Sequence, residues 1–197
     1  TSPNGSYNFI GQNGDEYPRM PQLQEDARTL TLGVPSLLGG ISKTLFCTAD
    51  DELRPVMNGV FFDIAADRLT LVATDAHKLV RYKTKHTSST IVEGDESVSF
   101  ILPKKPATML KNILPKESGE VQINFDKKNA YFKLANYTMI CRQVEGRFPN
   151  YNAVIPTTNP YKIIIDRATL LNAMKRVSVF ANQASNLVKL AFADNTI

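Results

Sequence analysis

The sequence has 197 residues, of which 43% are hydrophobic and 21% are charged, and its formal net charge is +4. This composition excludes a chain that is disordered as its main state, because it holds enough apolar side chains to build a core. No run approaches the roughly 18 apolar residues that a membrane span requires, and none resembles a secretory signal. Cys47 and Cys141 lie in apolar stretches, so we expect two reduced core cysteines in a cytoplasmic protein.

Both ends of the sequence look like cut ends of a longer polypeptide. The chain opens without an initiator Met and closes on the strand-like run LVKLAFADNTI. Tyr17-Pro18 and Phe148-Pro149 are each followed by a polar linker, a strand pattern and an apolar helix pattern. Identity between the copies is low, so only the order of elements supports a repeat, and chance can also produce such an order. A real repeat predicts a domain of about 130 residues, with one complete copy and parts of two others.

In the first half of the chain, hydrophobic periodicity predicts strands and one helix. A strand is expected at Thr29–Leu32, and a helix at about 36–48, where apolar residues recur at helical spacing. Alternating apolar residues then predict strands at Val60–Ile64 and Leu69–Ala73. Ala66-Asp67 supplies the turn signal between them, so these two strands are expected to form a hairpin.

The second half repeats this alternation of helix and strands. A helix is expected at about 104–114, with Pro106 in its first turn and Pro115 at its end. Strands around 121–125 and 132–134 flank the turn signal at 126–129. Near the end of the chain, the patterns predict a strand at Lys162–Ile165 and a helix at about 167–184 with Asp166 as its N-cap. The predicted fold class is therefore α+β, with two helices packed on antiparallel sheets in each domain.

The charged residues of the predicted helices have one sign. Soluble helices normally mix signs, so faces without acidic residues indicate a surface for a polyanion. The alternative is that few charges in a weakly basic protein look one-sided by chance. Lysines dominate and no aromatic stacking platform is visible, which favours contact with a phosphate backbone over base reading. The basic residues of these segments are Lys43, Lys104, Lys105, Lys111, Lys116, Arg167, Lys175 and Arg176.

The sequence offers little catalytic chemistry. It contains none of GxxxxGK[ST], GxGxxG, HExxH, CxxC or GxSxG, and only two histidines, His77 and His86. Asp75, His77 and Lys78 could form an acid–base cluster. The alternative is a turn in which Asp75 accepts hydrogen bonds from backbone amides, because no nucleophile or metal ligand set lies nearby in sequence. We therefore expect a binding protein with no catalytic residues, no metal and no cofactor.

Three motifs resemble one known family. The run NGVFFDIAADRLTLVATDAHKLVRY is followed after about 65 residues by EGRFPNY, and the run GQNGDEYPRMP precedes both. Together they resemble the bacterial DNA polymerase sliding clamp, the DNA polymerase III beta subunit. The resemblance covers the whole chain in order. It implies the DNA-clamp fold, with the end of a first domain at 1–27, a complete middle domain at 28–157 and the start of a third domain at 158–197.

The resemblance also implies how such a protein works. Two three-domain chains form a homodimeric ring, and the ring encircles double-stranded DNA in the bacterial cytoplasm and nucleoid. Non-specific phosphate contacts let the ring slide and hold the polymerase on its template. Pro55-Val56 replaces aromatic residues of some relatives at this surface. The residues implied to face DNA are Lys43, Arg54, Lys104, Lys105, Lys111, Lys175 and Arg176.

A second implied surface is a hydrophobic cleft between the middle and last domains. It binds short peptide motifs of the replicative polymerase, the clamp loader and repair polymerases. Ala76 stands where the family usually has Gly, and Ala153 where some members have Arg. The last strand of the third domain would complete the cleft. The cleft residues implied by the motifs are Met57, Thr74, Ala76, His77, Lys78, Leu79, Pro149 and Val154.

Two other functions remain open from the sequence. One is an α+β enzyme domain whose lysines hold a phosphorylated substrate. The other is a peptide-binding adaptor that does not bind DNA, which leaves the lysine-only helix faces unexplained. An enzyme should gather titratable groups in one deep polar pocket, whereas a clamp should show a shallow apolar groove and a flat basic helix face.

Overall fold

A computed structural model describes residues 3–94, 96–182, 185–193 and 196 of the chain. The chain divides into two compact units, residues 1–151 and residues 152–197. Parts of two predictions lie outside the described residues: positions 183–184 of the last helix and positions 194–195 and 197 of the last strand-like run. The described residues 187–192 of that run form no strand. No described helix is long and apolar enough to cross a membrane.

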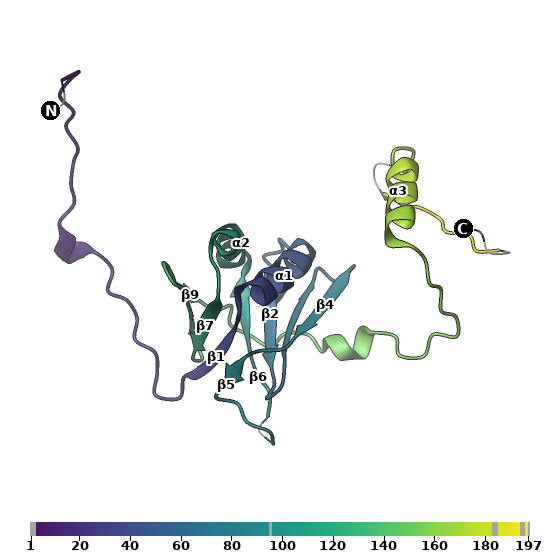
Figure 1. Cartoon of the computed structure of the whole chain (residues 1–197), viewed down its shortest axis with the longest axis horizontal. Coiled ribbons are helices and arrows are strands. Elements are labelled where there is room, and N and C mark those ends of the chain that lie inside the picture. Colours follow the sequence, from purple (N-terminus) through teal and green to yellow (C-terminus); the bar gives the residue numbers. More distant parts are fainter. Residues whose placement is uncertain (1–2, 95, 183–184, 194–195, 197) are drawn as a thin grey trace. The chain divides into compact units, whose positions relative to one another are not determined.

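The first unit contains two antiparallel sheets (Figure 1). The five-stranded sheet has the order β5-β1-β7-β8-β9, and the four-stranded sheet has the order β4-β3-β2-β6. The strands β1, β2, β3, β7 and β8 confirm the strand predictions, whereas β4, β6 and β9 were not predicted. In chain order the strands are β1 (Arg28–Gly33), β2 (Gly59–Ile64), β3 (Leu69–Thr74), β4 (Leu79–Thr84), β5 (Ser88–Ser89), β6 (Val98–Pro103), β7 (Glu120–Phe125), β8 (Asn129–Lys133) and β9 (Thr138–Arg142).

Aromatic residues join the two sheets into one core. Phe62 of β2 stacks on Phe100 of β6 with ring centroids 4.7 Å apart, and it meets Phe132 of β8 edge to face at 6.4 Å. Phe100 also contacts Phe125 of β7, at 4.9 Å. All four side chains are buried, so the two sheets share a single hydrophobic core.

Two helices cover this core side by side (Figure 1). Helix α1 (Val34–Thr44) continues as a 3-10 turn at Leu45–Cys47, and helix α2 (Lys104–Ile113) continues as one at Leu114–Lys116. Gly40 lets α1 approach β3 closely, because a Cβ there would lie 2.8 Å from Leu71 Cδ1. The helices confirm the predictions at 36–48 and 104–114 and, with the sheets, the α+β class.

The second unit contains one helix, α3 (Arg167–Ser178). Asp166 Oδ1 accepts a hydrogen bond from the Thr169 N–H at 2.7 Å, which confirms the predicted N-cap. The helix ends before residue 184, and none of its residues is buried. The predicted strand at Lys162–Ile165 is wrong, because the structure has no strand there. A β pattern becomes a strand only when another strand supplies hydrogen-bond partners, and no described residue does so for this run.

Candidate functional site

Side-chain hydrogen bonds hold the connection from β3 to β4 as a tight turn. Asp75 Oδ1 accepts from the N–H groups of His77 and Lys78, at 3.0 and 2.9 Å. Thr74 Oγ1 donates to the Lys78 carbonyl at 2.9 Å and accepts from the Ala76 N–H at 3.1 Å. Asp75 therefore satisfies backbone amides, which confirms the interpretation of this segment as a turn.

An ion pair adds to this turn. Lys78 Nζ lies 2.5 Å from Asp75 Oδ2. The hydrogen bond from Lys78 holds the pKa of the Asp75 carboxyl well below its usual range, and the backbone N–H groups act in the same direction. The same bond raises the pKa of Lys78. Both groups are therefore charged at neutral pH.

Ala76 adopts the left-handed backbone conformation, with φ of 75°. An alanine pays about 1–2 kcal/mol there, because its Cβ crowds the backbone, whereas glycine does not. The resemblance implies glycine at this position; the turn keeps the backbone conformation that glycine favours and accepts a Cβ. The side chains of Ala76, His77 and Lys78 are all exposed at the tip of the turn.

Met57 lies at the same end of the four-stranded sheet as this turn. Strand β2 begins at Gly59, β3 ends at Thr74, and the two strands are antiparallel, so the residues before β2 and after β3 are neighbours. The Met57 carbonyl accepts from the Ala49 N–H at 2.9 Å. Met57 and Leu79 are half-buried, so each presents part of an apolar side chain to solvent.

Cys47 lies fully buried beneath this end of the sheet. Burial raises the pKa of its thiol, and the nearby charge of Lys78 opposes that shift. Six of the predicted cleft residues thus lie at one end of the sheet, and the charge of one of them, Lys78, acts on the buried thiol. They are Met57, Thr74, Ala76, His77, Lys78 and Leu79.

Pro149 belongs to a segment that packs against β2. Phe148 stacks on Phe61 with ring centroids 4.5 Å apart and planes 6° apart. The Tyr151 hydroxyl donates a 2.8 Å hydrogen bond to Asp63. These contacts fix the conformation of the chain on either side of Pro149, which is itself half-buried. Val154, the remaining predicted cleft residue, belongs to the second unit and is 68% exposed.

The predicted DNA-facing residues on α1, on α2 and just before the 3-10 turn at Pro55–Met57 fall into two groups. Lys104 pairs with Asp50, and Arg54 Nε lies 2.7 Å from Asp51 Oδ2, so these two charges have acidic partners. Lys43 Nζ lies 5.0 Å from the centroid of the Tyr82 ring.

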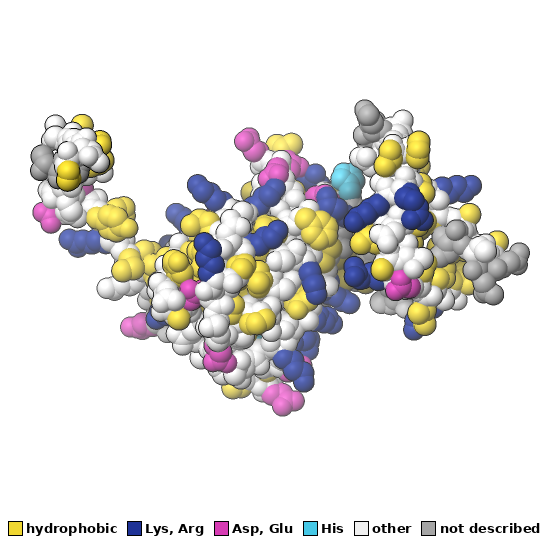
Figure 2. All heavy atoms as spheres, turned by 45° about the horizontal axis from the view of Figure 1, so that its top comes forward, with side chains coloured by type: hydrophobic (Ala, Val, Ile, Leu, Met, Phe, Trp, Pro, Cys, Tyr) yellow, Lys and Arg dark blue, Asp and Glu magenta, His cyan; other side chains and the backbone are white. Residues whose placement is uncertain are grey.

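The second group has no acidic partner. Lys105 and Lys111 are exposed on α2, and no ion pair involves either of them in the part of the chain that the structure describes. Figure 2 turns this side of the first unit forward and shows Lys and Arg side chains spread over it. In the second unit, Lys175 and Arg176 occupy the last turn of α3 and are exposed. Each of these side chains is available to an anion.

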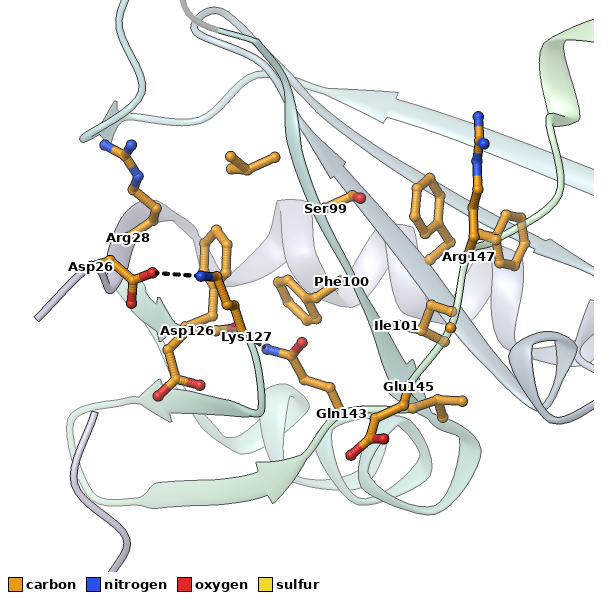
Figure 3. A pocket seen from close by; sticks show the side chains of 16 residues that line it. Asp26, Arg28, Ser99, Phe100, Ile101, Asp126, Lys127, Gln143, Glu145 and Arg147 are labelled. Atoms are coloured by element: carbon orange, nitrogen blue, oxygen red, sulfur yellow. Dashed lines mark hydrogen bonds and ion pairs between the residues drawn. The ribbon is translucent and has the colours of Figure 1, made fainter. Parts of the chain in front are cut away.

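One cavity in the first unit was not predicted from the sequence. A hollow of about 660 Å³ is lined by Phe61 and by residues of four further segments that are far apart in the chain: 26–28, 98–101, 125–127 and 143–148 (Figure 3). No motif spans these segments, and only the pairing of the strands brings them together. In the described residues, no group of three or more His, Cys, Asp or Glu is placed to hold a metal ion.

Comparisons with known proteins agree on one family. The family model described as "DNA polymerase III beta subunit, central domain" matches residues 32–150. A protein named beta sliding clamp from Staphylococcus aureus is 29% identical over the whole chain and 51% of its own length. The beta sliding clamp of Synechococcus elongatus is 28% identical over 95% of this chain and 49% of its own length.

Solved structures agree with this result. The DNA polymerase sliding clamp of Bacillus subtilis has a TM-score of 0.78 and 28% identity, covering 87% of this chain and 44% of its own. A sliding clamp of Bartonella birtlesii bound to griselimycin has a TM-score of 0.75 and 29% identity, covering 88% of this chain and 46% of its own. The chain spans about half the length of the relatives it matches. Its central-domain match and its fold together place this chain in the family of DNA polymerase III beta subunits.

Proposed function

We propose that the chain is part of a sliding clamp, a non-catalytic processivity factor that encircles duplex DNA and tethers polymerases to it. The observation that carries this proposal is the adjacent pair of helices α1 and α2, which contain lysines and no acidic residue. A surface of free lysines binds phosphates of any sequence, as sliding requires. The relatives carry the name beta sliding clamp. A homodimeric ring on chromosomal DNA, in the cytoplasm and nucleoid, follows from this role.

The proposed domain bounds are 1–27, 28–157 and 158–197. The DNA-facing residues proposed in the first unit are Lys43, Arg54, Lys104, Lys105 and Lys111. Those proposed in α3 are Lys175 and Arg176. No comparison favours the alternative of an enzyme acting on a phosphorylated substrate. An adaptor that ignores DNA would have no use for the unpaired lysines of α2.

The helix face can be tested by salt-dependent binding to a labelled DNA duplex. Each lysine that contacts a phosphate contributes about 0.9 to the slope of log K against log salt concentration. The double variant Lys105→Glu, Lys111→Glu should therefore lower the slope by about 2 and weaken binding at low salt by roughly a hundredfold. The control Lys133→Glu changes an exposed lysine on β8 and should leave the slope unchanged. Equal slopes for the double variant and the control would contradict the proposal.

The second working surface we propose is the peptide cleft at the end of the four-stranded sheet. Leu79, Val154 and Met57 would form its apolar floor. The exposed side chains of His77 and Lys78 would form its rim, and Thr74, Ala76 and Pro149 would shape the backbone around it. Short motifs of polymerases, the clamp loader and repair polymerases are the proposed ligands. Support comes from the rigid turn and from the half-buried leucine and methionine beside it.

Griselimycin is a suitable probe, since it is bound to the related clamp of Bartonella birtlesii. The chain should bind it, and both Leu79→Asp and Val154→Asp should lower the affinity by at least about tenfold, because each places a charge on an apolar wall. The matched control is Val179→Asp, a change to another exposed valine of the second unit. Circular dichroism should confirm that all variants fold. Unchanged affinity in folded Leu79→Asp would contradict the placement of the cleft.

A further inference from the structure

The 660 Å³ hollow opens beside the free edge of β6 (Figure 3). Strand β6 is the last strand of its sheet, paired with β2 on one side only. Ser99 and Ile101 line the hollow from this edge, and Arg28 and Arg147 lie at its opposite ends in the view of Figure 3. We refer to this hollow as the β6 groove.

The register of β6 leaves peptide groups unpaired on the groove side. Residues of an antiparallel pair alternate between hydrogen-bonded and non-bonded positions. The Lys104 N–H donates to the Asn58 carbonyl at 3.0 Å, so the pairs two and four residues further along are bonded as well. Ser99 and Ile101 therefore point their N–H and C=O groups away from β2. Consistent with this, the Ile101 carbonyl accepts from the Val144 N–H at 3.0 Å.

Beyond that one bond, the edge is open. Within the described part of the chain, no partner is recorded for the N–H and C=O of Ser99 or for the N–H of Ile101. These groups form the start of a ladder that an incoming strand could extend.

Aromatic side chains flank both faces of this edge. Phe100 and Phe125 lie on the core side of the sheet, in contact with each other. Phe61 and Phe148 lie on the opposite side, stacked at 4.5 Å. Side chains of a strand point alternately to its two faces, so a strand added to β6 would place successive residues against these two aromatic pairs. Apolar residues in its centre would fit both.

The charges of the groove favour an acidic ligand. Each acidic residue is already engaged: Asp26 with Lys127 at 3.4 Å, and Glu145 with Arg142 at 2.9 Å. Asp126 accepts hydrogen bonds from three backbone N–H groups. Within the described residues, the guanidinium groups of Arg28 and Arg147 have no ion pair and no side-chain hydrogen bond. The unsatisfied charges of the groove are therefore two guanidinium groups, which bind carboxylates well.

We propose that the β6 groove binds an extended peptide segment of a partner protein as an additional strand. The segment has apolar residues in its centre and acidic residues toward its ends. Main-chain hydrogen bonds to Ser99 and Ile101 hold it on the edge, the phenylalanines receive its central side chains, and Arg28 and Arg147 bind its carboxylates. This site is distinct from the peptide cleft at the β3–β4 turn.

The probe is a fluorescent eight-residue peptide of sequence Glu-Glu-Val-Leu-Val-Leu-Glu-Glu, titrated against the chain. We expect saturable binding that Arg28→Glu and Arg147→Glu each weaken by about tenfold, the loss of one charge-assisted hydrogen bond. Lys133→Glu, which changes an exposed lysine outside the groove, should have little effect, and so should Leu79→Asp. Absence of saturable binding overturns the proposal. A loss of binding in Leu79→Asp also overturns it, because the peptide would then occupy the other cleft.

Two methylated forms of the probe test the strand pairing itself. One carries N-methyl groups at its odd positions and the other at its even positions. Only alternate N–H groups of an added strand face β6, so one isomer should bind at least about tenfold more weakly while the other binds like the parent. If both isomers bind like the parent peptide, or if both bind equally weakly, the peptide does not bind as an added strand. This test leaves the protein unchanged, so misfolding of a variant cannot account for its result.

Discussion

The β3–β4 turn and the α1–α2 face are built in opposite ways. In the turn, hydrogen bonds and an ion pair give the side chains of Thr74, Asp75 and Lys78 fixed partners. On α2, Lys105 and Lys111 extend from a rigid helix without an acidic partner in the described chain. A surface that recognises the shape of a peptide needs fixed geometry, whereas one that slides along phosphates needs unpaired charge. The fixed turn therefore suits the proposed peptide cleft, and the unpaired lysines of α2 suit the proposed DNA-facing surface.

The largest loss of stability is expected at Gly59, because the pairing of β2 with β6 at this residue supports both the β3–β4 turn and helix α2. Gly59 begins β2, and its partner Pro103 immediately precedes α2. A Cβ at position 59 would lie 2.4 Å from the Leu102 carbonyl oxygen, which is backbone and cannot move aside. Gly59→Ala should therefore lower the free energy of unfolding by about 3 kcal/mol, measured by urea denaturation. Because both regions rest on this contact, griselimycin and DNA binding should weaken together. If Gly59→Ala abolished only one of the two binding activities and left the free energy of unfolding unchanged, this explanation would be wrong.

A change confined to the turn should act in the opposite direction. Ala76→Gly removes the Cβ from a residue with φ of 75° and should raise the free energy of unfolding by about 1 kcal/mol. DNA binding should stay the same, since the helix face is not involved. A matched change, Ala153→Gly, affects an exposed alanine and should bring no such gain. Destabilisation by Ala76→Gly would mean that the turn does not use the left-handed conformation.

A smaller effect should depend on pH. The folded-state pKa of Asp75 is depressed, so its contribution to stability is present above its unfolded pKa of about 3.9 and is lost as pH falls through the folded value. Asp75→Asn should therefore lower the melting temperature at pH 7, and its difference from the wild type should shrink as the pH is lowered below about 4. Thermal unfolding at several pH values measures this. A difference that stays constant down to pH 2 would contradict the ion pair.

The smallest effect concerns the lysine nearest an aromatic ring. Lys43→Met keeps an apolar chain above Tyr82 and removes the charge, so it should cost only about 0.5 kcal/mol of stability. On DNA, the same change should lower the salt slope by about 1. A large loss of stability with an unchanged slope would show that Lys43 serves the fold rather than the helix face.

The sequence predicted the elements whose signals are local. The helix at 104–114 was found because Pro106 and Pro115 frame an apolar stripe, and Asp166 was identified as a cap by residue type and position. Asp75 was correctly read as a turn residue for the same reason. The run at Lys162–Ile165 has an equally clear β pattern and is not a strand, because pattern alone supplies no hydrogen-bond partner.

Features that depend on distant pairing could not be predicted. Arg28 and Arg147 line the same groove although most of the sequence of the first unit lies between them. Phe61 and Phe148 are likewise far apart in sequence and stack on each other. The candidate cleft combines a local sequence signal with a contact that depends on strand pairing. Its turn is a continuous motif, but Met57 joins it only through the antiparallel pairing of β2 with β3. The assignment of these residues came from a family resemblance, and hydrophobic periodicity alone did not group them.

The most direct test of two separate working surfaces is a nuclear magnetic resonance titration of the isotopically labelled chain with griselimycin, followed by a DNA duplex. Griselimycin should shift the amide signals of residues 74–79 and Met57 and leave those of α1 and α2 in place. The duplex should then shift the signals around Lys105 and Lys111 and leave the turn unchanged. Griselimycin shifts centred on α1 and α2, or DNA shifts centred on the turn, would contradict the account.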